Sequence, residues 1–316
     1  MDHYIILGSG RGYLPHAAAP RPGNAAGGLW IDAPDALDRV HGRYETGQIT
    51  AEQAERLEAL VRDGFVVFQA VPDKAYSGEI PEMKFRCRDL GEGLTSWRPE
   101  VRELAAKALD PHYFSRSVRQ LIFAPAIVDF LGLIFETKAL ASQTLGFFRG
   151  SGQESHRDTW FVPFSRAISF AASWIALKDV TAGGGELFYY PGSHRLPERY
   201  FDNEFRSVSE AFRINSTNTL EDQIQEHVRE LTQNTRSFGL KRRRLMARRG
   251  DVLMWHADIG HGGEATSRLA TRKSIVTHYC PRHLIPDYCE RQATIFHDHE
   301  GHVFTSRIYV GQPVGD

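Results

Sequence analysis

The feature that most constrains the fold is a change in the texture of the sequence at about residue 141. From there on, short segments rich in Thr, Phe, Trp, Ile and Val alternate with clusters of Gly, Pro and Asp, as in SQTLGFFRG, ISFAASWIAL, DVLMWHAD and RKSIVTHYC. Short strands separated by turn residues at regular intervals are typical of an all-β sandwich or barrel. We therefore expect residues 141–316 to form a β-rich core.

The residues before this point predict helices with one early strand. Residues 51–63 carry apolar side chains on one helical stripe, Gly64 follows as a helix-ending residue, and the run FVVFQAV is typical of a buried strand. Residues 100–137 again show helical spacing. We expect residues 51–140 to form a mostly helical support, and residues 1–50, rich in Gly, Pro and Ala over much of their length, to form an arm or loop.

One long polar stretch, residues 196–237, interrupts the β-rich part, and its second half has helical spacing. Insertions of this length between strands are uncommon unless they serve as lids or binding elements. We therefore predict that this insertion is a lid over a binding site.

Charge and apolar content exclude several classes of protein. The chain has 38 Lys and Arg against 39 Asp and Glu, which argues against a nucleic-acid binder that works through bulk electrostatics. No apolar stretch is long enough to cross a membrane, and three cysteines without CxxC spacing favour a reducing compartment. We expect a cytoplasmic protein with a small-molecule partner. The sequence carries no signal for its oligomeric state.

A metal site is indicated by the segment His156-Arg157-Asp158. On a strand, positions i and i+2 point to the same side, so His156 and Asp158 are expected to reach one ion. An imidazole nitrogen and a carboxylate oxygen form a mixed donor set that suits Fe(II). A second histidine would complete one face of the ion and leave three positions open.

The same pattern recurs at His256 and Asp258, so downstream partners must decide between the two pairs. The second pair has His297 and Arg307 as candidate partners. Only 41 residues separate His256 from His297, however, which is short for the strands needed to bring them together.

The first pair has better partners. His261 follows His156 by 105 residues, and Arg272 comes eleven residues after His261 in a strand-like run. A guanidinium held there is suited to a two-pronged contact with the carboxylate of an organic acid. We therefore favour His156, Asp158 and His261 over the second set.

Four segments together resemble the phytanoyl-CoA dioxygenase family: HRD at 156–158, GGGELFYYPGSHR at 183–195, GDVLMWHADIGHGG at 250–263, and Arg272. Members are Fe(II)- and 2-oxoglutarate-dependent oxygenases built on a double-stranded β-helix. The resemblance covers about residues 140–280 and the helix and strand near 51–70. It implies a mainly β protein with flanking helices, whose core is a jelly roll of the cupin-like kind.

The resemblance also assigns roles to single residues. It implies that the iron ligands are His156, Asp158 and His261, that Arg272 binds the distal carboxylate of 2-oxoglutarate, and that Trp174 and Gln143 contact this cosubstrate. The family commonly has Gln in the middle of its HxD segment, whereas this chain has Arg157. No contact is therefore carried over from that position.

The implied function is a dioxygenase that uses Fe(II), 2-oxoglutarate and O2 to hydroxylate a C–H bond of a small metabolite or natural-product intermediate, with release of succinate and CO2. Two alternatives stay open: a non-catalytic β-helix domain that binds a small acid or sugar, and a cupin-type metal enzyme that does not use 2-oxoglutarate. The basic run at 241–249 is either a solvated face or a docking point for an anionic group of the substrate.

Overall fold

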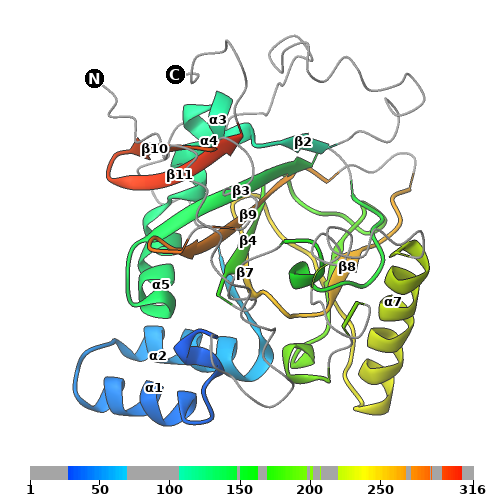
Figure 1. The fold of residues 1–316 in the computed structure, drawn as a ribbon, viewed down its shortest axis with the longest axis horizontal. Helices are drawn as coiled ribbons and strands as arrows, with labels where there is room; N and C mark the ends of the chain where they lie inside the picture. The colour runs from blue at the N-terminus through cyan, green and yellow to red at the C-terminus, as the bar shows by residue number, and fades with distance from the viewer. Residues whose placement is uncertain are drawn as a thin grey trace, which may run out of the picture.

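The computed structural model describes residues 28–69, 107–147, 150–162, 169–197, 200–201, 207, 220–267, 272–284, 286 and 294–307. Two facing β-sheets form its core, and helices cover the outer face of the larger sheet (Figure 1). The mainly β architecture with flanking helices, expected from the sequence, is confirmed. Residues 1–27, the first part of the expected N-terminal arm, lie outside the described residues.

The larger sheet has the strand order β1-β7-β4-β9-β3-β11-β10, with β2 paired to β3. All of its neighbouring strands are antiparallel except β11 and β3, which are parallel. Its strands are β1 (Phe65–Phe68), β2 (Lys107–Leu109), β3 (Ala139–Phe147), β4 (Ala171–Ala176), β7 (Val252–His256), β9 (Ser274–Pro281), β10 (Thr294–His299) and β11 (His302–Arg307).

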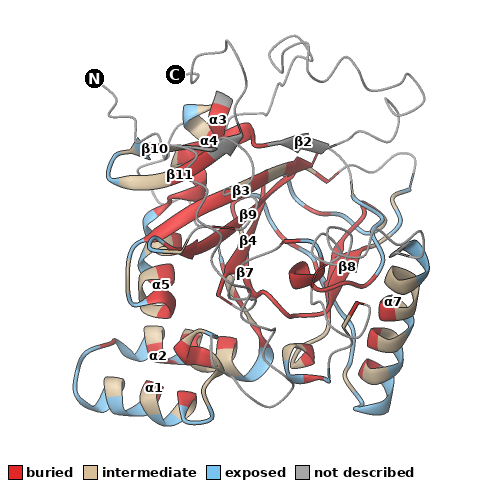
Figure 2. Ribbon diagram, viewed as in Figure 1, coloured by how far each residue is buried: buried red, intermediate tan, exposed pale blue. Residues whose placement is uncertain are grey.

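The smaller sheet has the order β6-β5-β8, formed by β5 (Leu187–Tyr189), β6 (Arg243–Leu245) and β8 (His261–Gly263). Trp174, Leu253 and Val276 from the larger sheet pack in one apolar cluster with Leu187 and Leu245 from the smaller one. Because side chains alternate between the faces of a strand, these residues define the inner face of the larger sheet. Figure 2 shows that the central strands are buried along almost their whole length.

The outer face of the larger sheet is covered by the helices η1 (Trp30–Asp32), α1 (Ala36–Glu45), α2 (Ala51–Asp63), α4 (Arg116–Ile122) and α5 (Pro125–Phe135); α3 (Pro111–Phe114) precedes α4. Helix α2 begins at a reciprocal cap in which Thr50 accepts from the Gln53 backbone and Gln53 accepts from the Thr50 backbone. It ends at Gly64, whose positive φ of 79° favours glycine. The predicted helix at 51–63 and the strand after it are confirmed.

Two segments differ from the expected secondary structure. Residues 36–45, expected within an arm or loop, form helix α1, because Ala36 and Val40 lie one turn apart and both pack into the core. Ala108, placed at helical spacing in the sequence, lies in strand β2 opposite Gly146. Pairing with β3 therefore overrides the local helical pattern there.

The insertion contributes one long helix, α7 (Leu220–Ser237), as its spacing predicted. This helix lies beside β8, on the side of the molecule away from α1, α2 and α5 (Figure 1). Its Leu231 packs with Trp160, Leu196 and Phe201 in a small apolar cluster. The insertion residues 198–199, 202–206 and 208–219 lie outside the described part of the chain.

Among the described helices, none alone is long and apolar enough to span a membrane. Helices α4 and α5 pass that test of length and composition only as a pair, and the pair is bent by 51°.

Candidate active site

His156 and His261 are placed side by side by a short antiparallel bridge. The His156 N–H donates to the His261 carbonyl at 2.8 Å, and the His261 N–H donates back at 3.0 Å. His261 begins strand β8, and Asp158 begins the short helix η5 (Asp158–Trp160). The expectation that Asp158 continues a strand is wrong, because the chain turns at this residue. The turn still brings its carboxylate to the two imidazoles.

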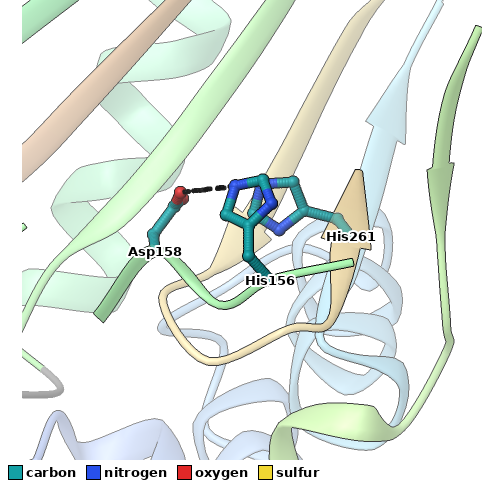
Figure 3. Close-up of side chains that lie close together, drawn as sticks. All are labelled: His156, Asp158 and His261. Atoms are coloured by element: carbon teal, nitrogen blue, oxygen red, sulfur yellow. Dashed lines mark ion pairs between the residues drawn. The ribbon is translucent and has the colours of Figure 1, made fainter. Parts of the chain in front are cut away.

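The three side chains converge on one point (Figure 3). Asp158 Oδ1 lies 3.5 Å from His261 Nε2 and 3.9 Å from His156 Nε2. One ligand atom from each residue lies within 4.8 Å of the other two, and all three residues are buried. Two imidazoles and one carboxylate arranged this way are the donor set of a facial triad that leaves part of the metal's surroundings open.

The imidazole rings are oriented as metal ligands require. His156 Nδ1 donates to the Glu154 carbonyl at 2.8 Å, and His261 Nδ1 donates to the Ile259 carbonyl at 3.0 Å. Because a carbonyl only accepts, each Nδ1 carries a proton, which makes Nε2 the ring nitrogen available to a metal ion on the side of Asp158. A ligating histidine commonly donates its other ring N–H in this way, so these residues fit a divalent metal ion.

The carboxylate of Asp158 is ionised. Burial alone would raise its pKa, but His261, His278 and His156 around it outweigh burial and hold the pKa well below the usual range of an aspartate. A buried carboxylate that faces two imidazole nitrogens is a site that favours a cation.

The second oxygen of Asp158 is held by residues that the sequence analysis did not single out. Trp255 Nε1 donates to Oδ2 at 2.7 Å, and His278 Nε2 lies 3.4 Å from the same oxygen. Trp255 and His278 both stand opposite Ala172 in the sheet, so β7 and β9 place them on either side of it. The alternation of side chains along β7 and β9 predicts that Trp255 and His278 point inward. No sequence pattern predicts the turn that brings Asp158 next to them.

Arg272 is buried just before strand β9, with an exposed fraction of 2%. Its Nη1 donates to the Gly185 carbonyl at 2.8 Å, and its guanidinium carbon lies 5.5 Å from the centre of the Trp174 ring. Burial lowers the pKa of Arg272 to about 10, against the opposite effect of Glu186. The side chain therefore stays charged at neutral pH, although it is almost wholly removed from water.

Several buried polar atoms around Arg272 have no hydrogen-bond partner among the described residues. These atoms are Arg272 Nε, Trp174 Nε1 and Ser274 Oγ. Leaving buried donors unpaired costs free energy, so such a group marks a place that suits a polar ligand. An anion that contacts the guanidinium would give Arg272 Nε an acceptor.

Arg272 and the triad open onto the same inner face of the larger sheet. One face of β9 carries Ser274, Val276 and His278. At one end of this face His278 contacts Asp158. At the other end, Arg272 lies two residues before the first residue of the strand. Ser274 and His278 are four residues apart, which on a strand corresponds to about 13 Å. Gln143 on β3 stands opposite His278, which places it on this face as well.

The comparisons with known proteins agree with this geometry. A family model described as Phytanoyl-CoA dioxygenase (PhyH) matches residues 85–274, which is more than half of the chain. The chain belongs to the phytanoyl-CoA dioxygenase family. No curated protein matches its sequence. The cofactor that this family membership and the triad support is iron, with 2-oxoglutarate as cosubstrate.

Solved structures show the same fold at low sequence identity. EctD from S. alaskensis with 2-oxoglutarate and 5-hydroxyectoine has a TM-score of 0.53 and 16% identity, covering 89% of this chain and 87% of that chain. The non-heme alpha ketoglutarate dependent carbocyclase SnoK from nogalamycin biosynthesis has a TM-score of 0.50 and 16% identity, covering 76% and 87%. The expected double-stranded β-helix is thereby confirmed.

In this member of the phytanoyl-CoA dioxygenase family, the second HxD pair forms part of a buried polar network. His256 Nε2 lies 2.7 Å from Asp32 Oδ1, and Asp258 accepts from Thr159 Oγ1 at 2.5 Å. Burial lowers the pKa of His256, but Asp32 outweighs burial and the pKa is raised. His297 lies elsewhere, stacked on Phe304 in the β10–β11 hairpin. The structure therefore does not assemble the second constellation.

Arg157, which stands where family members commonly have Gln, links the triad segment to the start of the insertion. Its Nη2 donates to the carbonyls of Ser193 and Leu196 at 3.3 and 3.1 Å, and its Nη1 lies 4.0 Å from Asp258. The Arg157 side chain is buried. It holds residues 191–196 of this family member against the segment that carries Asp158.

Helix α7 packs against the segment that carries His156 and Asp158. His227 lies edge-on to Trp160, next to Asp158, with ring centres 5.3 Å apart, and stacks on Phe201 at 3.9 Å. Gln225 donates to Glu154 at 3.4 Å. The insertion therefore touches the site through the ligand loop itself.

Two arginines of the basic run form ion pairs at the surface. Arg242 and Arg244 both pair with Glu264 Oε1, at 2.5 and 2.8 Å, and both are exposed. Arg242 also lies over the ring of Phe188 at 3.8 Å. These contacts favour the solvated-face interpretation over an anion-docking one.

Proposed function

We propose that this chain is an Fe(II)- and 2-oxoglutarate-dependent dioxygenase that hydroxylates a C–H bond of a small-molecule substrate, with release of succinate and CO2. The observation that carries the proposal is the convergence of two imidazole Nε2 atoms on Asp158 Oδ1. A buried arginine with unpaired donors around it opens onto the same face of the sheet. Membership of the phytanoyl-CoA dioxygenase family supports the same chemistry.

His156, Asp158 and His261 would hold the metal. When bound, the iron would supply the oxygen-activating chemistry needed to oxidise an unactivated C–H bond, with 2-oxoglutarate as the source of two electrons. The residues supply orientation and charge: two neutral imidazoles and one carboxylate leave a net charge of about +1 on the divalent ion, which favours an anionic keto acid.

Arg272 would bind the far carboxylate of 2-oxoglutarate. Its charge sits where the local dielectric is low, so an ion pair made there is stronger than one at the surface. Trp174 walls one side of the guanidinium, and the Ser274 hydroxyl stands on the same face as a further donor. Gln143 is proposed as an additional cosubstrate contact because it stands opposite His278.

The substrate would approach from the side of Phe161. This residue is 40% exposed, and its ring lies 5.6 Å from that of His156. Helix α7 covers the adjoining Trp160 and limits the access of water to the triad. We propose hydroxylation because Asp158 takes the ligand position that a halide would need in a halogenating relative.

The proposal is tested by succinate formation from 2-oxoglutarate in the presence of Fe(II) and a panel of candidate substrates. Asp158→Ala is expected to abolish substrate-dependent succinate release without unfolding the protein. Asp38→Ala, an exposed aspartate on α1, serves as the matched control and is expected to behave as wild type. Full activity of Asp158→Ala would refute the assignment of the triad.

A further inference from the structure

The two oxygens of Asp158 have different neighbours. Oδ1 faces the Nε2 atoms of His156 and His261. Oδ2 accepts the Trp255 indole N–H at 2.7 Å and lies 3.4 Å from His278 Nε2. One oxygen is thus presented to the metal-binding side, and the other is held by the larger sheet.

The direction of the hydrogen bond between Trp255 and Asp158 is fixed by the indole group. An indole nitrogen donates and never accepts, so Trp255 is the donor of this short hydrogen bond and Asp158 Oδ2 is the acceptor. Trp255 is 2% exposed, so water does not compete for Oδ2. His278 does not belong to the group of ligand atoms within 4.8 Å of one another, so it touches Asp158 from the far side.

The sheet fixes both of these neighbours. Trp255 on β7 and His278 on β9 stand opposite Ala172, the residue of β4 that lies between them. Groups held by strands in register are placed more precisely than groups on loops. The Trp255 ring also lies 5.0 Å from that of His261, so one side chain contacts two of the three proposed ligands.

We propose that Trp255, assisted by His278, is a positioning residue that makes Asp158 a one-oxygen ligand; this inference rests on the proposed function. A carboxylate that bound through both oxygens would occupy one of the three positions that 2-oxoglutarate and dioxygen require. With Oδ2 engaged by the indole N–H, only Oδ1 is offered to the metal. The sheet therefore keeps the third position open.

The test uses the full chain loaded with Mn(II), which binds oxygen and nitrogen ligands and allows metal-bound water to be counted by water-proton relaxation. Trp255→Phe keeps an aromatic ring and removes the N–H. It is expected to weaken Mn(II) binding about 10- to 100-fold, the usual effect of losing a partner of a ligand. It is also expected to reduce the metal-bound waters from about three to about two.

His278→Leu removes the longer contact and is expected to change both measurements in the same direction by a smaller factor. It also keeps the test possible if Trp255→Phe folds poorly. The matched control is Trp30→Phe, because Trp30 Nε1 donates to the Leu133 carbonyl at 3.0 Å, away from the site. Trp30→Phe is expected to leave Mn(II) affinity and water count unchanged.

Wild-type affinity and water count in Trp255→Phe would overturn the positioning role and leave the proposed function standing. A wild-type protein that binds neither Mn(II) nor Fe(II) would overturn both. Weaker binding together with one metal-bound water fewer, seen in Trp255→Phe and not in Trp30→Phe, supports the inference.

Discussion

Gly262 directly follows His261 and has no room for a side chain. A Cβ built there would lie 2.7 Å from the Gln153 carbonyl oxygen and 2.5 Å from Phe188 Cζ. Gln153 belongs to the segment that leads into His156, and Phe188 belongs to β5. The glycine after His261 is therefore required for the close approach of the two chain segments that pair His156 with His261.

Gly262→Ala is expected to push these segments apart. The strain against backbone atoms should cost about 1–3 kcal/mol of unfolding free energy and weaken Fe(II) binding. Gly132→Ala is the control, since no atom lies within 4 Å of a Cβ at this position in α5. It should stabilise the protein by about 0.5–1 kcal/mol through helix propensity. Denaturant unfolding and metal titration measure both effects, and an unaltered metal affinity in Gly262→Ala would contradict this account.

Arg272→Lys is expected to impair cosubstrate binding although the charge is kept. Lysine cannot make the two-pronged contact with a carboxylate, and its ammonium is costlier to bury. The KM for 2-oxoglutarate should rise tenfold or more, while kcat changes less. Arg244→Lys, at an exposed ion pair with Glu264, should leave both constants as in wild type. A wild-type KM in Arg272→Lys would remove Arg272 as the carboxylate anchor.

For single residues, the sequence predicted which three side chains come together, but it did not predict the residues that contact them. The order and spacing of His156, Asp158 and His261 narrowed the choice, and the structure assembles these three and not His256 with His297. Trp255 and His278 escaped notice because an inward tryptophan or histidine on a strand is first of all a core residue. Only the turn at Asp158 makes them its neighbours.

Helix α7, which we propose as a lid, contacts the chain segments that carry the proposed metal ligands. Leu231 fits against the backbone at Gly260, where an added Cβ would lie 3.3 Å from both of its methyl carbons. Gly260 immediately precedes His261. One apolar side chain of α7 therefore rests on the chain segment that leads to a proposed metal ligand.

Leu231→Ala is expected to leave a cavity beneath α7 and cost about 2–5 kcal/mol of local stability. Amide hydrogen exchange in residues 220–237 should accelerate while the strands of the larger sheet stay protected. Turnover of 2-oxoglutarate without substrate oxidation should increase, because water reaches the site. Gln233→Ala, on the exposed side of α7, is the control. Unchanged exchange and coupling in Leu231→Ala would show that α7 does not act as a lid.

Elements with a clear period were predicted well, and those decided by distant pairing were not. The helix at 51–63 has a cap, a stripe and a terminal glycine within its own sequence. Strand β2 has three residues and exists through its pairing with β3, so its own sequence contains too little information. Helix α1 was hidden by the Gly- and Pro-rich composition that precedes it.

Across the whole molecule, buried neutral histidines make stability depend on pH. His112 joins α3 to two strands: its ring lies 2.5 Å from Thr144 Oγ1 and donates to the Thr305 carbonyl at 2.6 Å. Burial is the main cause that lowers the pKa of His112 to about 4, although the bond to Thr305 opposes it. A proton therefore binds the unfolded chain more readily than the folded one.

The sign of the effect follows from this difference. The contribution of His112 to the free energy of unfolding is complete above the ordinary histidine pKa of 6.5. It falls by about 1.4 kcal/mol per pH unit as the pH drops toward 4. Between pH 7 and pH 5 the metal-free protein should lose about 2 kcal/mol through His112. His112→Asn, which cannot titrate, should be less stable at pH 7 but lose about 2 kcal/mol less over this interval. Parallel losses in both proteins, measured by denaturant unfolding, would contradict the assignment.

The central claim is that His156, Asp158 and His261 hold one ferrous ion to which 2-oxoglutarate binds. The most direct measurement is an anaerobic titration with Fe(II) followed by 2-oxoglutarate, monitored by metal analysis and visible absorption. We predict one iron per chain and a charge-transfer band that appears only when 2-oxoglutarate is added, both lost in Asp158→Ala. Absence of stoichiometric iron in the wild type, or the same band in Asp158→Ala, would contradict the claim.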